Sequence, residues 1–300
     1  MPILCAAVDW GTSSFRLWLL DAAGDVLAER RGGEGMGTIG AGGFGPVLEA
    51  HLAAVGAAPD LPVVACGMVG ARQGWVEAPY VETPTTMAGI AGRARRVTVH
   101  SRPVFILPGV AQRVTDEPDV MRGEETQLLG LPHQESHRIV CLPGTHSKWV
   151  ALDNDRIDRF ATFVTGDLFS AIAGHTILRH SVEDPPKQFD RGRFVTAFRA
   201  ALERPGEVTN QLFAIRARGL LDRETGADGA SALSGLLIGL EFAGALSRFG
   251  PVAELTLVAS GRLLGIYQTA CEIAGVAVAV EDAEASVRRG LFAAAKEILS

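Results

Sequence analysis

The stretch Asp9-Trp10-Gly11-Thr12-Ser13-Ser14-Phe15-Arg16 joins two short apolar segments. The segments Ile3 to Val8 and Phe15 to Leu20 predict the two strands of a hairpin, and Gly-Thr-Ser-Ser predicts its turn. A tight turn of glycine, threonine and serine presents backbone N–H groups and hydroxyls to an anion without a lysine or arginine. The hairpin therefore predicts a phosphate-binding loop.

A second hairpin of the same design follows later in the chain. Its expected strands are Ile139 to Leu142 and Lys148 to Leu152, and its turn is Gly144-Thr145-His146-Ser147. Setting Gly11 on Gly144 aligns the threonines and the last serines of the two turns without a gap. Two such loops facing each other across a cleft could hold a polyphosphate between two lobes. The duplication therefore predicts a nucleotide clamp.

Only the first loop follows an acid, since Asp9 stands where the second hairpin has Leu142. A carboxylate beside a phosphate loop repels phosphate unless a divalent cation lies between them, so Asp9 predicts a Mg²⁺ site, reached through water. The alternative is that Asp9 only shapes and caps its own turn.

The rest of the chain alternates short apolar strands with helical segments, which indicates an α/β protein in two lobes. We expect the N-terminal lobe to span residues 1–120 and the C-terminal lobe 121–300, with a final helix that can return to the first lobe. Glycines are dense from Gly32 to Gly45 and predict a long loop. The expected helices are Val47–Val55, Asp167–Arg179, Phe194–Leu202, Ala227–Ala245, Ile266–Ala274 and Ala283–Leu299.

The composition indicates a globular protein and argues against two classes of partner. Of the 300 residues, 47% are hydrophobic and 21% are charged, as expected for a chain with a large core. The 28 Lys and Arg against 34 Asp and Glu give a net charge of -6 without a basic run, which disfavours nucleic acid and anionic membranes as partners.

The location of the protein follows from its cysteines and apolar segments. Cys5, Cys66, Cys141 and Cys271 form no C-x-x-C motif, as expected for reduced thiols in the cytoplasm. The N-terminus lacks the basic region of a signal peptide. The longest apolar run, Leu233 to Leu246, carries Glu241 and is shorter than the roughly 20 residues that span a bilayer. We therefore expect a soluble cytoplasmic protein.

These motifs resemble those of the actin/hexokinase/Hsp70 ATPase superfamily. Asp9–Arg16 resembles its first phosphate loop and Leu142–Trp149 its second, while Leu257–Arg262 is similar to its adenosine motif, with Gly261 in place of the usual glycine pair. The resemblance implies a two-lobed actin-like, ribonuclease H-like fold with duplicated lobes, an interdomain cleft and bound ATP.

From Val8 to the last helix, the chain resembles the 2-dehydro-3-deoxygalactonokinase family more specifically. The segments that carry this resemblance are Gly67–Trp75, Arg122–Gln127 and Thr165–Phe169, together with the second loop. It implies a sugar-acid kinase that uses ATP and Mg²⁺ to convert 2-dehydro-3-deoxy-D-galactonate to its 6-phosphate in galactonate catabolism.

The catalytic base is implied by the Gly-Asp that sugar kinases place at a helix start upstream of the second phosphate loop. This chain has Gly123-Glu124 there, so Glu124 is the candidate. Glu125 could take that role or share metal and base duties with it, and Asp167, at the head of another helix, is a further candidate. Alternatively, both glutamates only favour the positive end of the helix dipole.

The remaining site residues are expected around the phosphates and the sugar acid. Arg16 would point toward the γ-phosphate and Lys148 could act from the other lobe, or Lys148 could be a solvated strand lysine. Gly261 belongs to the adenosine motif. The phosphates would be lined by Gly11, Thr12, Ser13, Gly144, Thr145 and His146.

The sugar acid needs a cation or oriented donors for its carboxylate. Arg72, flanked by Gln73 and Trp75, is the candidate, with a plain surface turn as the alternative. Gly35 to Gly40 matches G-x-G-x-x-G, but no apolar strand precedes it and no helix opens within it, so we expect Gly35 and Met36 to close over the substrate, with Glu125 nearby.

Other functions stay open at this stage. Within the kinase class, 2-dehydro-3-deoxygluconate or another sugar could be the acceptor, because epimers differ by the position of one hydroxyl. A non-catalytic sugar-acid sensor and a dehydrogenase built on the glycine-rich loop are the alternatives from other classes. No P-loop motif occurs in the sequence. A homodimer is reasonable because exposed hairpins are expected.

Overall fold

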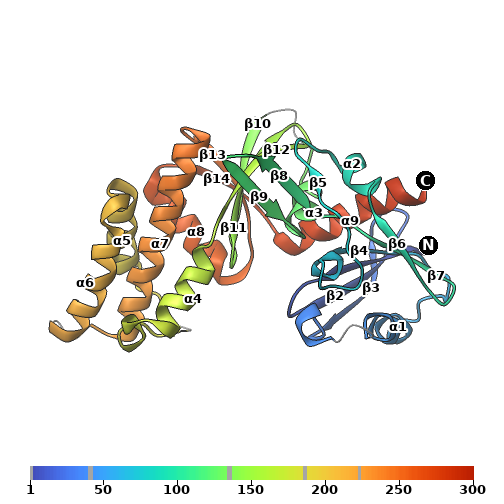
Figure 1. The fold of residues 1–300 in the computed structure, drawn as a ribbon, viewed down its shortest axis with the longest axis horizontal. Helices are drawn as coiled ribbons and strands as arrows, with labels where there is room; N and C mark the ends of the chain where they lie inside the picture. Colours follow the sequence, from blue (N-terminus) through green and yellow to red (C-terminus); the bar gives the residue numbers. More distant parts are fainter. Residues whose placement is uncertain (1–2, 40–42, 134–136, 185–187, 222–223) are drawn as a thin grey trace. The chain divides into compact units, whose positions relative to one another are not determined.

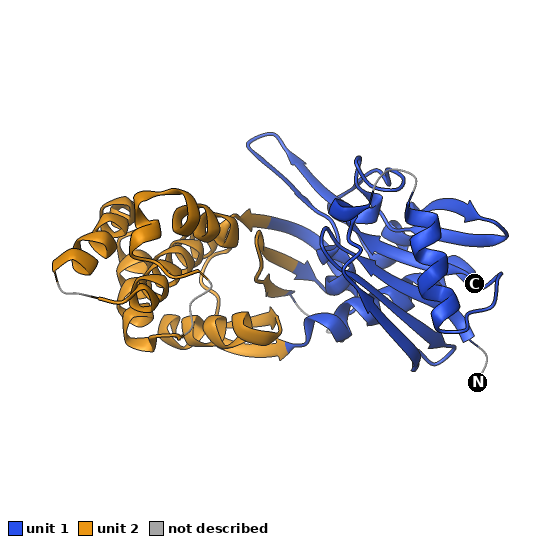
Figure 2. Ribbon diagram, turned by 90° about the horizontal axis from the view of Figure 1, so that it is seen from below, with its two compact units in different colours: residues 1–137, 152–160, 281–300 blue, residues 138–151, 161–280 orange. Residues whose placement is uncertain are grey.

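The computed structural model describes residues 3–39, 43–133, 137–184, 188–221 and 224–300. The chain forms two compact units, shown in Figure 2. Unit 1 consists of Met1–His137, Leu152–Phe160 and Glu281–Ser300, and unit 2 of Arg138–Ala151 and Ala161–Val280.

These bounds differ from the expected boundary at residues 120 and 121, because residues 121–137 and 152–160 belong to unit 1. The last helix, which the sequence allows to return to the first lobe, also belongs to unit 1. The reason is a close contact between helices α3 (Glu124–Leu129) and α9 (Ala283–Leu299). A Cβ at Gly130 would lie 1.9 Å from the Ser286 oxygen, and one at Gly290 would lie 1.9 Å from the Thr126 oxygen. The two glycines let the backbones touch.

Unit 1 is built on a six-stranded sheet with the order β3-β2-β1-β4-β7-β6 (Figure 1). Strand β1 pairs antiparallel with β2 and parallel with β4. The strands are β1 (Ile3–Trp10), β2 (Phe15–Asp21), β3 (Val26–Gly32), β4 (Val63–Gly67), β6 (Arg95–Val99) and β7 (Arg102–Ile106). A smaller sheet contains β5 (Val81–Glu82), β8 (Val110–Val114) and β9 (Glu117–Met121). The shorter helices are η1 (Met36–Thr38), α1 (Phe44–Ala54), η2 (Met68–Gly70) and α2 (Met87–Ala91).

The second sheet has the order β12-β11-β10-β13-β14, with β10 parallel to β13. Its strands are β10 (His137–Leu142), β11 (Ser147–Asp153), β12 (Arg156–Phe163), β13 (Glu254–Val258) and β14 (Ala277–Glu281). In both sheets three consecutive strands are followed by a parallel strand beside the first, so the expected duplication of one design is present in the topology.

Most helices of unit 2 pack together, and α7 contacts both α5 and α6 (Figure 1). The helices are α4 (Thr165–His175), η3 (Ile177–His180), α5 (Arg191–Glu203), η4 (Pro205–Glu207), α6 (Val208–Leu221), α7 (Gly226–Phe249) and α8 (Gly261–Ala274). Helix α7 is long and apolar enough to cross a membrane, but 72% of its most apolar window is buried inside the protein. It is therefore a core helix.

Two expectations for helices need correction. The helix predicted over 167–179 ends at His175, because Thr176 is extended and its hydroxyl caps η3 by accepting the N–H of Leu178. Helix α6 is not predicted by the sequence, since Phe213 and Leu220 are exposed and interrupt an amphipathic pattern.

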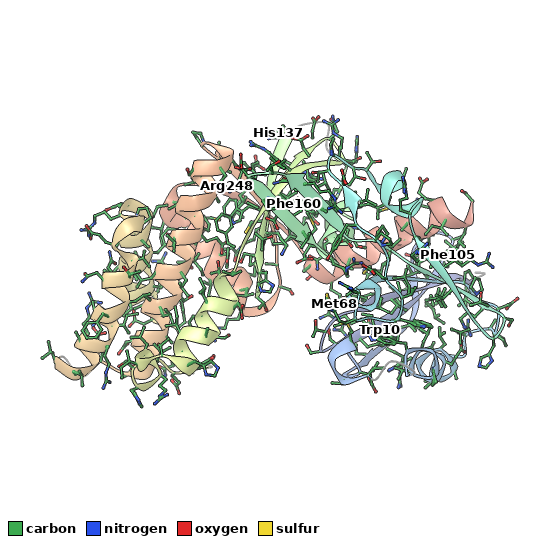
Figure 3. The ribbon with its side chains drawn as sticks, viewed as in Figure 1. Trp10, Met68, Phe105, His137, Phe160 and Arg248 are labelled. Carbon is green, nitrogen blue, oxygen red and sulfur yellow. The ribbon has the colours of Figure 1, made fainter. Side chains whose placement is uncertain are left out.

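Each unit has its own hydrophobic core. In unit 1 the ring of Trp10 packs edge-on against Phe15 and Phe44, with ring centroids 4.8 and 5.3 Å apart. Figure 3 shows Trp10, at the end of β1, close to Met68, the first residue after β4. The core of unit 2 lies between the second sheet and helices α5, α7 and α8. All four cysteines are free and buried, as expected for core thiols.

Candidate active site

The first loop of unit 1 is a tight turn that leaves its central amides available. The N–H of Gly11 donates to the Ser14 carbonyl at 2.9 Å and closes the turn. The carbonyls of Gly11 and Thr12 accept the N–H groups of Met36 at 2.9 Å and Gly37 at 2.8 Å. Within the described residues, the N–H groups of Thr12 and Ser13 have no hydrogen-bond partner. Carbonyls directed into the protein and free amides are what an anion-binding turn requires.

The glycine-rich loop lies directly against this turn. A Cβ at Gly35 would be 2.3 Å from the Thr12 oxygen, so only glycine fits there. The indole N–H of Trp10 donates to the Glu34 carbonyl at 2.8 Å and fixes the loop from the other side. Gly35 and Met36 are thus adjacent to the first loop, while Gly40 of the glycine motif lies outside the described residues.

Three elements of unit 1 converge on Gly67. Trp10, at the end of β1, pairs with Gly67, at the end of β4. Gly67 has φ 90°, and a Cβ there would lie 2.8 Å from the Trp10 oxygen. A Cβ at Gly123, before α3, would lie 3.5 Å from the Gly67 Cα. This close packing brings Asp9 of β1 near Glu124 of α3.

Asp9 lies in a mostly acidic environment. One of its carboxylate oxygens accepts a hydrogen bond from Arg16 at 3.1 Å. Burial raises the pKa of Asp9, Arg16 opposes that rise, and the nearby carboxylates of Glu284 and Glu124 add to it. Arg16 therefore forms an ion pair with Asp9, and its expected approach to the γ-phosphate stays a prediction.

Glu284, which no sequence motif singles out, reaches this cluster from the start of α9. Its carboxylate lies 3.9 Å from Arg16 Nε and 2.5 Å from Arg31 Nη2. The sequence feature that points to Glu284 is the final helix, which is expected to be able to return to the first lobe.

Among the described residues, no group of three or more His, Cys, Asp or Glu side chains is placed to hold a metal ion. Mg²⁺ usually keeps several waters and is bound through one or two carboxylates and the phosphates of a substrate, so a single carboxylate beside the first loop fits it. Asp9 is the residue that would hold it, beside the free amides of the first loop.

The two glutamates at the start of α3 have different environments. Glu124 is half-buried and accepts the backbone N–H of Arg122 at 3.0 Å. Glu125 is only 1% exposed and accepts the Gly123 N–H at 2.6 Å and the Thr126 hydroxyl at 3.0 Å. Burial and, secondarily, the charge of Glu124 raise the pKa of Glu125 to about 8.

The expected sugar-acid turn starts at the same point, directly after Gly67. It is compact, since the N–H of Trp75 donates to the Val69 carbonyl at 2.8 Å. Arg72 and Gln73 are exposed, and no ion pair joins Arg72 to the described residues. The ring of Trp75 stacks on Phe44 with centroids 6.0 Å apart, so Trp75 belongs to the aromatic core of unit 1 as well as to this turn.

The second loop, in unit 2, repeats the arrangement of the first. The Thr145 carbonyl accepts the N–H of Asp167 at 3.0 Å, and the His146 carbonyl accepts Lys148 Nζ at 3.2 Å. In the part of the chain that the structure describes, the N–H groups of Thr145 and His146 have no partner. Lys148 is only 4% exposed, so the alternative of a solvated strand lysine is wrong. Asp167 is exposed and lies 3.7 Å from the His146 ring.

An apolar cavity adjoins the second loop within unit 2. Gly261 does not line it, but this glycine, with φ 61°, starts α8, whose next two residues do. The cavity is lined by Gly144, Thr165, Gly166, Phe169, Asp184, Ser234, Leu237, Ile238, Arg262, Leu263, Ile266 and Tyr267. It therefore lies where the expected adenosine motif and the second phosphate loop meet.

Comparison with known proteins gives one family. A sequence model described as 2-keto-3-deoxy-galactonokinase matches residues 9–294. A Rhizobium meliloti protein described as a probable 2-dehydro-3-deoxygalactonokinase is 52% identical over 98% of this chain and 97% of its own length. A 2-dehydro-3-deoxygalactonokinase of Escherichia coli is 32% identical over 95% of each chain.

Solved structures agree with the fold. A crystal structure from Sinorhizobium meliloti, with 52% identity, superposes with a TM-score of 0.94 over 98% of this chain and 99% of its own. An activator of 2-hydroxyisocaproyl-CoA dehydratase from Clostridium difficile, with bound ADPNP, has 14% identity and a TM-score of 0.50 over 98% and 95% of the two chains. The two-lobed α/β kinase fold expected from the sequence is confirmed.

Proposed function

The chain belongs to the 2-keto-3-deoxy-galactonokinase family, and we propose on that premise that it transfers the γ-phosphoryl group of ATP to the 6-hydroxyl of 2-dehydro-3-deoxy-D-galactonate. The products are the sugar-acid 6-phosphate and ADP, and the pathway is galactonate catabolism. The observation that carries the proposal is the pair of matching loops, in each of which the N–H groups of the two central residues have no partner among the described residues and can bind phosphate.

The two units have separate tasks in this proposal. Unit 1 carries the first phosphate loop, with Gly11, Thr12 and Ser13, and the sugar-acid site. Unit 2 carries the second loop, with Gly144, Thr145 and His146. The adenosine moiety occupies the apolar cavity of unit 2, where a mostly hydrophobic lining with a few polar groups suits a purine base.

Each unit carries residues that offset phosphate charge at its own loop. Mg²⁺ held by Asp9 would supply electrostatic stabilisation of the phosphate oxygens. Arg16 is oriented by its ion pair with Asp9. It lies near the start of β2, the strand that follows the first loop. Lys148 holds the second loop through the His146 carbonyl and brings a positive charge to it.

Glu124 is the base in this proposal. It removes the proton of the 6-hydroxyl, whose oxygen then bonds to the γ-phosphorus as the bond to ADP breaks. The support for Glu124 over Glu125 is that Glu124 is only half-buried. Glu125 is buried, and its raised pKa keeps it mostly protonated at neutral pH. Asp167 belongs to unit 2, where its N–H binds the second loop, whereas Glu124 belongs to unit 1 together with Asp9.

The sugar acid binds near the turn after Gly67. Arg72 has an exposed side chain without an ion pair to the described residues, so its guanidinium can form a bidentate pair with the substrate carboxylate. Gln73 and Trp75 flank it, and Gly35 and Met36 lie against the first loop. Glu125 accepts the Gly123 N–H and so fixes the start of α3, which carries Glu124. Binding of the sugar acid would exclude water from the reaction.

The cellular setting that we propose is the cytoplasm, with two small-molecule substrates and no nucleic acid or membrane partner. The buried free thiols and the net charge of -6 support this setting. A homodimer is part of the same proposal, with the exposed Val114 and Val120 of the β8–β9 hairpin as the apolar surface.

A coupled assay of ADP release with MgATP tests the function. The substrate panel contains 2-dehydro-3-deoxy-D-galactonate, its gluconate epimer, galactonate, glucose and glycerol. We expect turnover with the galactonate-derived keto acid, at a kcat/KM at least tenfold above that of its epimer. Turnover with the epimer alone would identify a different kinase, and ATP binding without turnover on any acceptor would favour a sugar-acid sensor.

A further inference from the structure

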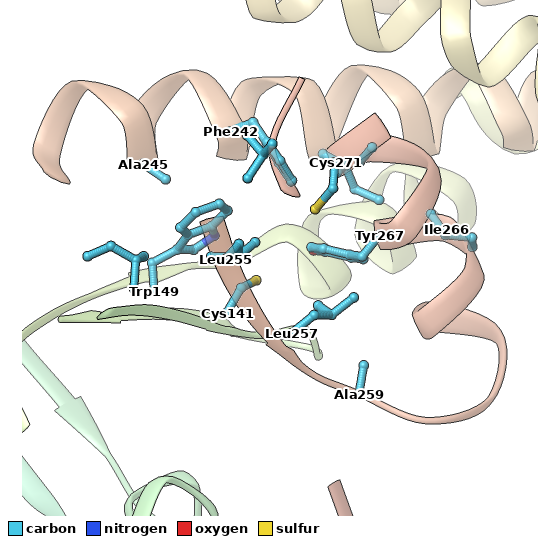
Figure 4. Packing of buried hydrophobic residues seen from close by; sticks show 14 of the residues in the cluster. Cys141, Trp149, Phe242, Ala245, Leu255, Leu257, Ala259, Ile266, Tyr267 and Cys271 are labelled. Atoms are coloured by element: carbon cyan, nitrogen blue, oxygen red, sulfur yellow. The ribbon is translucent and has the colours of Figure 1, made fainter. Parts of the chain in front are cut away.

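Glu241 is a buried carboxylate that the proposed reaction does not use. It belongs to α7, is 1% exposed, and accepts hydrogen bonds from residues of four other elements, of which the thiol of Cys141 on β10, at 4.0 Å, is the longest. Trp149 Nε1 of β11 donates at 2.9 Å, the Thr165 hydroxyl of α4 at 2.5 Å and the Tyr267 hydroxyl of α8 at 2.8 Å. A buried carboxylate is tolerated only when such donors replace water. Figure 4 shows Trp149 and Tyr267 in the hydrophobic cluster beside α7.

Two of these donors connect Glu241 to the second phosphate loop. On one side, the Tyr267 hydroxyl lies 3.0 Å from Ser147 Oγ, which accepts the N–H of Gly144 at 3.4 Å. On the other side, Thr165 starts α4, whose next residue, Gly166, packs so closely that a Cβ there would lie 2.7 Å from the Gly144 oxygen. Glu241 is therefore connected to the second loop itself, through Tyr267 and Ser147, and to the start of α4 that packs on the loop, through Thr165.

The hydrogen bonds along this path have a defined direction. The indole N–H of Trp149 can only donate, so the oxygen it faces must accept. The Tyr267 proton goes to Glu241, which leaves the Tyr267 oxygen to accept from Ser147, and Ser147 in turn accepts from Gly144. A carboxylate ends this chain because it only accepts.

Replacing Glu241 by glutamine keeps the size of the side chain and changes this direction. The amide oxygen must face Trp149, so the amide NH₂ faces Thr165 and Tyr267, where two acceptors are then needed. Both hydroxyls must turn, and the Ser147 hydroxyl loses its acceptor on Tyr267. Glu241 does not line the cavity, but Thr165 and Tyr267 do. The substitution therefore changes the hydrogen bonds of cavity residues from outside the cavity.

We propose that Glu241 is a positioning residue for nucleotide binding: through Thr165, Tyr267 and Ser147 it holds the second phosphate loop in the geometry that receives the phosphates of ATP. This inference rests on the proposed function in taking the loop and its cavity as the nucleotide site.

The test compares Glu241→Gln, Tyr267→Phe and the double variant with wild type and with Leu255→Val. Leu255 belongs to the same hydrophobic core and makes no hydrogen bond to Glu241, so this variant controls for a loss of core stability alone. For each protein, calorimetry measures the Kd of ADP, steady-state assays measure kcat and both KM values, and thermal unfolding measures Tm.

We expect Glu241→Gln and Tyr267→Phe each to raise the Kd of ADP and the KM of ATP by roughly five- to tenfold, as for the loss of about one buried hydrogen bond. The KM of the sugar acid stays within twofold of wild type. The increase in the Kd of ADP in the double variant is expected to be smaller than the product of the two single increases, because both substitutions interrupt the same chain of hydrogen bonds. Leu255→Val lowers Tm and leaves the Kd of ADP unchanged.

The inference is overturned if the two variants bind ADP as tightly as wild type does. It is also overturned if Leu255→Val raises the Kd of ADP as much as they do for the same loss of Tm. If Glu241→Gln fails to fold, Tyr267→Phe decides alone. A wild-type protein that binds ADP without phosphorylating any sugar acid contradicts the proposed function and leaves the Kd comparison decisive. A wild-type protein that binds no nucleotide overturns both.

Discussion

The protonation of Glu125 gives a quantitative prediction for stability. Folding raises the pKa of this carboxyl from 4.5 to about 8, with burial as the largest cause. An acid whose pKa is raised on folding is most favourable to the folded state below its unfolded pKa. As pH rises above 4.5, the unfolded chain loses this proton first, so the stability of the folded state falls until pH passes about 8.

The magnitude follows from the difference between the two pKa values. At about 1.4 kcal/mol per pKa unit, the full effect is about 5 kcal/mol, of which about 2.5 kcal/mol falls between pH 6 and pH 9. Glu125→Gln has no ionisable group at this position and should lack that part of the pH dependence. We expect the free energy of unfolding of the variant to equal or exceed that of wild type at pH 9. At pH 6 the difference should be smaller, or the variant should be less stable than wild type.

Urea unfolding at pH 6, 7, 8 and 9 measures this effect, with the free energy of unfolding compared between wild type and variant at each pH. Glu203→Gln, which removes an exposed acid from the end of α5, is the matched control and should keep the wild-type slope. If Glu125→Gln also kept that slope, Glu125 would ionise normally in the fold. It would then compete with Glu124 as the catalytic base.

Four further substitutions test individual parts of the site. Glu124→Gln should lower kcat by roughly 10²- to 10⁴-fold while calorimetry still detects ATP binding, and a near-normal kcat would remove Glu124 as the base. Asp9→Asn should abolish Mg²⁺-dependent turnover, and a titration of activity against Mg²⁺ that resembles wild type would contradict its role as the metal residue. Arg72→Ala should raise the KM of the sugar acid by roughly tenfold or more with kcat little changed, so an unchanged KM would leave the turn as a surface feature. Gly35→Ala places a Cβ 2.3 Å from the Thr12 oxygen, so it should displace the first loop and raise the KM of ATP, and kinetics equal to wild type would show that the two loops move independently.

The local parts of the site could be predicted from the sequence. A turn of Gly-Thr-Ser-Ser or Gly-Thr-His-Ser determines its own backbone shape through neighbouring residues, so both hairpins form with strand ends within two residues of the expected ones. The same holds for Gly123-Glu124 at a helix start and for the alternation of strands and helices that gives the α/β class.

The tertiary structure alone decided which groups these loops meet and how each group is charged. Glu284 joins Asp9 and Arg16 from a helix more than two hundred residues away in sequence, because α9 packs against α3 through Gly130 and Gly290. Burial, which no short pattern records, separates Glu125 from its neighbour Glu124 and removes Lys148 from solvent. Glu241 has the clearest signal in the sequence, as the one acid in the longest apolar run, yet its donors come from four separate elements. The physical reason is that turn geometry depends on adjacent residues, whereas desolvation and hydrogen-bond partners depend on which distant segments pack together.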